Sequence, residues 1–149
     1  MLFLRNKKRR IVYLVAAAFL AFIGIIVAIS NVPPDSFSRA QVSEGLNISG
    51  GAKATVTEYY QDHGQFPSDN VSAGLPLATD IQGKYVSSVR VDAGEIIVTF
   101  GNDANSDIQG KTLILRPERS DNLVKWVCLS LDIESRNVPS ACRPENGDR

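Results

Sequence analysis

Cys128 and Cys142 are the only two cysteines in this 149-residue chain, and they carry its clearest potential chemistry. Two thiols form a disulfide in an oxidising compartment, or they contribute ligands to a metal site. A metal site would need further ligands nearby, and the single histidine, His63, lies far away in sequence. We therefore predict a disulfide between the two cysteines, which closes a loop worth about 3 kcal/mol in the chain-entropy model.

The remaining polar residues do not form a recognisable catalytic or cofactor site. His63 has no neighbouring cysteine, serine motif or carboxylate pair, so we interpret it as a solvated loop residue. The run Asp103–Asp107 places oxygen ligands at alternate positions, as calcium loops do, but Ile108 and Ile114 stand where glycine and glutamate are expected. We predict a polar turn there, with no catalytic residue, no cofactor and no metal, in a protein that is not an enzyme.

Charge is distributed unevenly along the chain. The 16 basic and 16 acidic residues balance overall, but five basic residues precede the first apolar run: Arg5, Lys7, Lys8, Arg9 and Arg10. The remaining 11 basic and 16 acidic residues give the rest of the chain a net charge of −5. Nucleic-acid binding requires a basic face, so no nucleic-acid binding is predicted for the isolated domain.

An uncharged and mostly apolar segment runs from Ile11 to Ile29. As a helix it would be roughly 28 Å long, which is close to the ~30 Å hydrocarbon core of a bilayer. The preceding residues 1–10 form a basic flank, which the positive-inside rule places in the cytoplasm. A cleaved signal peptide is the competing interpretation, because Ala28 and Ser30 are small. Signal sequences usually contain ~7–15 apolar residues, so the length favours a retained, single-pass transmembrane helix that contacts lipid.

A second helix is predicted beyond a proline-containing break at residues 30–36. Pro33 and Pro34 interrupt helical structure, and Asp35 or Ser36 can cap a new helix. Apolar residues then recur at helical spacing from about Phe37 to Tyr60. They are Val42, Leu46, Ala52, Val56, Tyr59 and Tyr60. Three glycines weaken this helix, so it should depend on packing its apolar stripe against another element.

Alternating apolar residues then predict four strands, which we place at Tyr85–Val91, Glu95–Phe100, Lys111–Arg116 and Leu123–Leu131. Such alternation favours an antiparallel sheet with one buried face, and the amphipathic helix is the natural element to cover that face. The predicted fold class is α+β: an N-terminal transmembrane helix, then an amphipathic helix packed on a four-stranded antiparallel sheet. The globular domain spans residues 37–143, and residues 144–149 form a flexible tail.

Many short segments of the chain, in order, resemble type IVa pilins. They are Arg39–Gly45, Ala52-Lys53, Glu58–Tyr60, Gly64–Pro67, Ser72–Gly74, Ala78–Ser88, Ile108–Leu113, Trp126–Cys128 and Pro139–Arg143. No single segment is diagnostic, but so many in register indicate the type IV pilin family. The resemblance implies a long helix wrapped by an antiparallel sheet, framed by an exposed loop, here Gln61–Gly83, and a disulfide loop, here Cys128–Cys142.

The resemblance also implies a function and a location. Pilins are stored in the bacterial inner membrane, with the C-terminal domain in the periplasm, and assemble into surface fibres for adhesion, motility or DNA uptake. The implied function is therefore a structural subunit, a major or minor pilin. Its partners would be other pilin subunits or inner-membrane assembly proteins. The alternative is a membrane-anchored accessory or regulatory protein that binds these partners without entering the fibre.

The N-terminal residues depart from the family pattern. Prepilins have a leader that ends in glycine, followed by an apolar run that contains one glutamate. Here Arg9 and Arg10 precede Ile11 directly, and no acidic residue occurs before Asp35. In pilins the glutamate is thought to meet the new amino terminus of a neighbouring subunit, since a lone carboxylate in an apolar helix is costly. The sequence therefore does not predict whether the N-terminal segment is cleaved or whether the subunits assemble into fibres.

Overall fold

The computed structural model of the chain describes residues 12–25, 34–120 and 123–143. They belong to two compact units that divide after Pro33, and the first contains a helix at residues 12–25. In the described part of the chain, no helix combines the length and the hydropathy needed to cross a bilayer. The ends of the predicted span, the basic flank and the tail lie outside the described residues.

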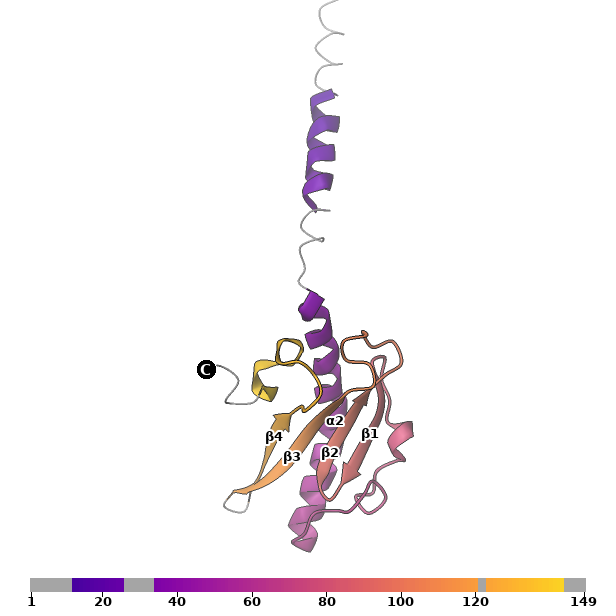
Figure 1. Ribbon diagram of the computed structural model, residues 1–149, viewed down its shortest axis with the longest axis vertical. Helices are drawn as coiled ribbons and strands as arrows, with labels where there is room; N and C mark the ends of the chain where they lie inside the picture. The colour runs from indigo at the N-terminus through magenta and orange to yellow at the C-terminus, as the bar shows by residue number, and fades with distance from the viewer. Residues whose placement is uncertain (1–11, 26–33, 121–122, 144–149) are drawn as a thin grey trace, which may run out of the picture. The chain divides into compact units, whose positions relative to one another are not determined.

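The second unit begins with the long helix α2, Pro34–His63 (Figure 1). The predicted helix is confirmed, but it starts earlier than expected. The prediction that Asp35 or Ser36 caps the helix was wrong, because both residues lie inside it. Proline is compatible with the first turn, where the amide has no helical partner and the fixed φ suits the helix. The helix ends at His63. The next residue, Gly64, has a left-handed φ of 69°, and its amide donates to the Tyr60 carbonyl at 2.8 Å.

The four strands form one antiparallel sheet in the order β1-β2-β3-β4. They are β1 (Val86–Asp92), β2 (Glu95–Phe100), β3 (Thr112–Ser120) and β4 (Leu123–Leu129). Each predicted strand is confirmed within a few residues, except that β3 continues past Arg116. The turn after β1 has positive φ at Ala93 and Gly94, as a two-residue hairpin requires.

Pro117 explains why β3 was predicted too short. A proline normally ends a strand because it cannot donate to the ladder. Here β2 pairs with β3 only as far as Leu115, whereas Pro117 is paired with Trp126 on β4. The outer half of β3 therefore has a strand on one side only, and such an edge tolerates proline.

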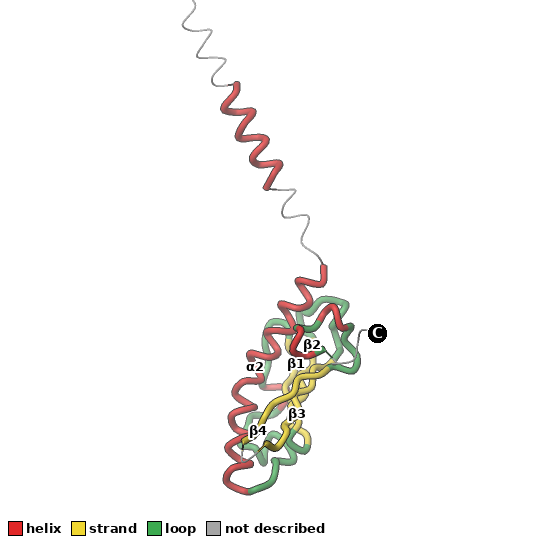
Figure 2. Tube along the Cα trace, turned by 90° about the vertical axis from the view of Figure 1, so that its left-hand side faces the viewer, coloured by secondary structure: helices red, strands yellow, loops and turns green. Residues whose placement is uncertain are grey.

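The core lies between α2 and one face of the sheet (Figure 2). Val42 and Val56 of α2 are fully buried, as are Ile96 and Val98 of β2. These residues share faces at the predicted helical and alternating spacings. Burying each such side chain contributes about 1.5–3 kcal/mol. The packing of α2 on the sheet therefore holds the domain together.

The loop between α2 and β1 is fixed along the outer edge of the sheet by Asn70, which is 6% exposed. Its side-chain amide donates to the carbonyls of Pro76 at 2.9 Å and Val89 at 3.1 Å. Its Oδ1 accepts from the backbone amide of Val91 at 2.6 Å. Because β1 is an edge strand, these bonds satisfy polar groups that would otherwise be open to pairing with another chain.

Asn70→Ala should lower the free energy of unfolding by about 1–3 kcal/mol, because it leaves the buried amide of Val91 without its acceptor. Asn47→Ala is the matched control, since Asn47 is exposed on α2 and alanine favours helix. Chemical denaturation of the purified protein measures both. Equal midpoints for the two variants would contradict this role of Asn70.

Candidate assembly surfaces

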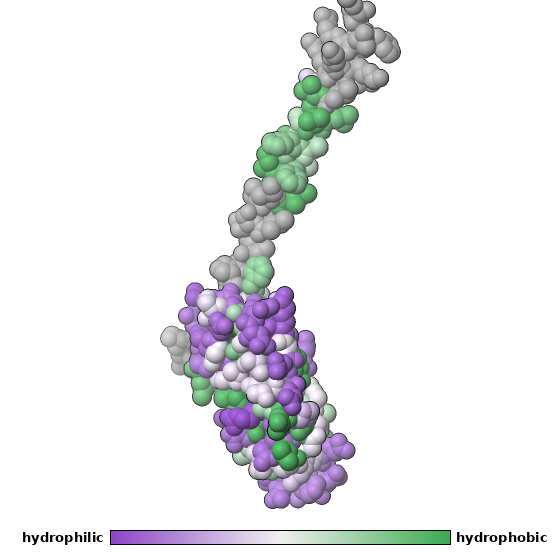
Figure 3. All heavy atoms as spheres, turned by 90° about the vertical axis from the view of Figure 1, so that its right-hand side faces the viewer, coloured by the Kyte–Doolittle hydropathy of each residue, from purple (hydrophilic) through white to green (hydrophobic). Residues whose placement is uncertain are grey.

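The helix of residues 12–25 is apolar on all sides. Its large side chains are 42–72% exposed: Val12, Tyr13, Leu14, Val15, Phe19, Leu20, Phe22, Ile23 and Ile25. Figure 3 shows this helix as mostly hydrophobic on the visible face, whereas the globular domain is largely polar there. A helix without a polar side is normally buried in a protein core or a membrane. This surface can pack against apolar groups, and the Tyr13 hydroxyl is the one polar side-chain group within residues 12–25.

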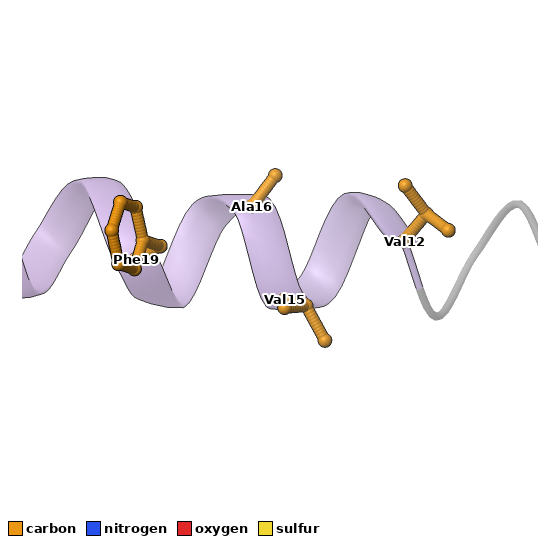
Figure 4. Close-up of a pocket in the computed structure, with 4 residues that line it drawn as sticks. All are labelled: Val12, Val15, Ala16 and Phe19. Atoms are coloured by element: carbon orange, nitrogen blue, oxygen red, sulfur yellow. The ribbon is translucent and has the colours of Figure 1, made fainter.

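A shallow hollow on this helix is lined by Val12, Val15, Ala16 and Phe19. Figure 4 shows these four side chains along successive turns. Their spacing of three and four residues places them near one another on the helix surface. The small side chain of Ala16 beside Phe19 gives the helix a ridge and a groove, the relief by which helices pack together.

The C-terminal segment is fastened to the sheet by a disulfide between Cys128 and Cys142, whose Cα atoms are 4.5 Å apart. It joins β4 to the short helix η3, Ser140–Cys142. Between them, Ile133 and Val138 are buried in the main core. The preceding short helix η2, Ser135–Asn137, packs against α2. The disulfide loop is therefore part of the folded domain and not a loose appendage.

Asp132 orders the beginning of the same segment. Both of its carboxylate oxygens lie 3.0 Å from the backbone amide of Thr112. The hydroxyl groups of Thr112 and Ser130 also donate to this carboxylate, each at 3.1 Å. Bonds from neutral donors to a carboxylate are among the stronger ones in proteins. They fix the chain where it leaves β4.

Glu44 anchors the other framing region, where the loop after α2 enters β1. Its carboxylate accepts hydrogen bonds from the backbone amides of Lys84 at 2.8 Å and Tyr85 at 3.1 Å. Earlier in this loop, the Asp69 carboxylate accepts from the backbone amide of Ser72 at 2.7 Å. This bond, with the hydroxyl bonds of Ser72 and Ser68, lowers the pKa of Asp69 below its ordinary value of 3.8.

The other predicted residues lie in separate places. His63 is the last residue of α2 and not a loop residue. It is exposed, and its ring stacks on Tyr59 with the ring centres 4.1 Å apart. The run Asp103–Asp107 forms turns between β2 and β3. Among residues 12–25, 34–120 and 123–143, no three or more His, Cys, Asp or Glu residues are grouped to hold a metal.

One feature was missed by the sequence interpretation, which took Tyr60 as a packing residue. Tyr60 stacks on Phe66, with ring centres 4.5 Å apart. The guanidinium of Arg119 lies 5.2 Å from the centre of the Tyr60 ring and 5.5 Å from that of Phe66. Tyr60, Gln61, Gly64, Arg119 and Leu123 line a hollow beside this stack, which we name the Arg119 hollow. The spacing of residues in the sequence does not predict this contact, because Tyr60 and Arg119 are about 60 positions apart.

Replacing either cysteine with serine should lower the free energy of unfolding by about 2–5 kcal/mol, since the open chain gains conformational freedom when unfolded. Ser140→Ala is a suitable control, because Ser140 is exposed in the same short helix. Denaturant titrations under non-reducing conditions provide the measurement. If the cysteine variants have the same unfolding midpoint as the Ser140→Ala control, the disulfide contributes nothing to stability.

The hydrogen bonds of Asp69 predict a pH-dependent loop. Because its pKa is lowered on folding, the stabilisation is present above the ordinary value and is lost as pH falls through the folded value. The amide NMR signal of Ser72 should therefore titrate with a midpoint below 3.8. Asp69→Asn should abolish that titration. A midpoint at or above the ordinary value would contradict the hydrogen-bonded arrangement.

Comparison with known proteins agrees with this architecture. Residues 38–143 match the pilin family of bacterial filament proteins. A fimbrial protein of Neisseria meningitidis serogroup A is 46% identical over 111 residues, which cover 73% of this chain and 65% of that protein. This chain thus spans slightly less than two thirds of that relative.

Two other relatives are covered more fully. The type IV major pilin protein PilE of Neisseria gonorrhoeae is 38% identical over 145 residues, which cover 83% of this chain and 87% of that pilin. The fimbrial protein EcpC of Eikenella corrodens is 40% identical over 130 residues, which cover 83% of each chain. Together with the helix, sheet and disulfide described above, these matches show that the chain belongs to the pilin family.

Proposed function

We propose that this protein is a structural subunit of a type IV pilus, in which copies pack through their apolar N-terminal helices and display their globular domains outside. The observation that carries the proposal is the helix of residues 12–25, which exposes large apolar side chains in all directions. Membership of the pilin family supports it. So do relatives named type IV major pilin and fimbrial protein.

The proposal includes a location and a division of the chain. Residues 1–10 would be a cytoplasmic flank, and Ile11 to Ile29 would hold the subunit in the inner membrane before assembly. Residues 30–36 would connect this span to the domain at 37–143, with a tail at 144–149. Assembly would exchange lipid contacts for contacts with neighbouring helices, so close packing and not the hydrophobic effect would select the helix partner. Adhesion, motility or DNA uptake would be functions of the fibre.

A second candidate is an accessory or regulatory protein that stays in the membrane and binds pilins or assembly proteins. One observation favours it: the helix of residues 12–25 contains no acidic residue. The glutamate that the pilin resemblance implies is therefore missing from this helix. Without that carboxylate, one means of aligning neighbouring subunits is absent.

Mass spectrometry of sheared fibres and of membranes distinguishes the two candidates. The full chain would be produced as the only pilin of a bacterium that has the assembly machinery. A structural subunit should be recovered from the sheared fibres. Recovery from the membrane alone, with residues 1–10 intact, would exclude the structural role. A trimmed, N-methylated form in fibres would exclude the permanent anchor.

Phe19→Ala tests the helix surface itself, because it removes a large exposed side chain but leaves an apolar helix for the membrane. We expect about a tenfold loss of sheared fibre, with the amount in the membrane unchanged. Val71→Ala is the matched control, since Val71 is 73% exposed in the loop after α2. Equal fibre yields from the two variants would argue against packing through this helix.

A further inference from the structure

We infer that the Arg119 hollow of one copy binds the acidic loop between β2 and β3 of a second copy, so that domains contact one another head to tail. The inference rests on the proposed function, since it names a contact between neighbouring subunits of the fibre. It is carried by a cation at one end of the domain and two carboxylates at the other, none of which has an ion-pair partner within residues 34–120 and 123–143.

Arg119 is exposed but held in position. Its guanidinium lies against both rings of the Tyr60–Phe66 stack. Within residues 34–120 and 123–143, the other exposed arginines of the sheet pair with carboxylates, Arg90 with Asp92 and Arg116 with Glu95. Arg119 forms no such pair there. Stacking on aromatic rings leaves the guanidinium N–H groups free to donate to a carboxylate.

The surroundings of Arg119 suit a protein partner. The hollow is lined by Gln61 and Gly64, from the end of α2 and the residue after it, and by Leu123 of β4. Leu123 is 69% exposed, although it is a large apolar residue beside a charged one. Arginine and aromatic residues such as tyrosine are enriched among the residues that contribute most to protein interfaces.

The acidic loop lies between β2 and β3 and presents Asp103 and Asp107. Both residues are exposed, and among the described residues neither carboxylate accepts a hydrogen bond or forms an ion pair. The loop backbone is nevertheless fixed. The backbone amide of Asn105 donates to the side-chain oxygen of Gln41 on α2 at 2.8 Å. The side-chain amide of Asn102 donates to the carbonyls of Gly83 and Val86, each at 3.0 Å.

Two surfaces that are already rigid lose little entropy when they meet, which favours binding. Figure 1 shows the β2–β3 loop at the end of the domain where α2 begins. The outer half of the β3–β4 hairpin, which carries Arg119, lies at the end where α2 finishes. Because the cation and the carboxylates lie at opposite ends, one domain cannot satisfy both internally. A contact between different patches on identical copies repeats along an open filament when the rotation between copies does not close a ring.

Charge reversal tests the contact in the full-length chain, produced as the only pilin in a bacterium that assembles fibres. Arg119→Glu should reduce sheared fibre about tenfold relative to the unchanged protein, because it places like charges together. The double variant Asp103→Arg, Asp107→Arg should show a similar loss. Combining all three substitutions should restore most of the yield, since opposite charges meet again.

Arg90→Glu is the matched control: it makes the same charge change on β1, at the opposite edge of the sheet from β4. It should leave the yield within about twofold, because exposed ion pairs contribute little. Arg119→Met removes the charge but keeps an apolar side chain over the rings. It should melt like the unchanged protein and still lose fibre.

Several outcomes would overturn the inference. Fibre yield from Arg119→Glu that equals the Arg90→Glu control would exclude the hollow as a subunit contact while leaving the structural role intact. A loss that the triple variant does not restore would mean that the hollow binds something other than the acidic loop. Absence of fibres from the unchanged protein would overturn the proposed function, and this contact with it.

Discussion

At Gly45 the helix α2 lies against the ring of Phe100, and the rest of the domain is arranged around that contact. A Cβ atom at this position would come 2.9 Å from the ring, closer than side chains normally allow. Glycine lowers the helix propensity of α2, but it lets the helix approach the sheet closely enough to bury Val42 and Val98 completely. Tertiary packing therefore outweighs local preference in this helix.

Once α2 and the sheet are packed, the two framing regions are secured by polar side chains and by the disulfide. Asn70 and Glu44 attach the loop after α2 to β1 and its entry. The disulfide and Asp132 attach the C-terminal segment to β4 and β3. Both regions thus lie over the outer strands of the sheet, where open edges would favour unwanted pairing. The same bonds give a filament subunit fixed surfaces to present to its neighbours.

The sequence predicted the elements better than it predicted the surfaces. The periods of 3.6 and 2 revealed α2 and four strands, because a buried face requires regularly spaced apolar residues. The start of α2 and the end of β3 were predicted wrongly, because the effect of a proline depends on its surroundings. Pro34 lies in the first turn of α2, and Pro117 lies where β3 has no partner strand on one side. The Arg119 hollow could not be predicted, because exposed residues carry no period and its members are distant in the chain.

In the proposed fibre, the apolar helix and the domain contacts would act in sequence and not as alternatives. Packing of the helices of residues 12–25 would place neighbouring domains at a high effective concentration, so each domain contact becomes nearly intramolecular. A contact such as that of Arg119 with Asp103 and Asp107 is then strong enough even if an isolated pair is worth less than about 1 kcal/mol. Conversely, isolated domains with these surfaces should remain monomeric. The helix would supply proximity, and the charged surfaces would select the arrangement.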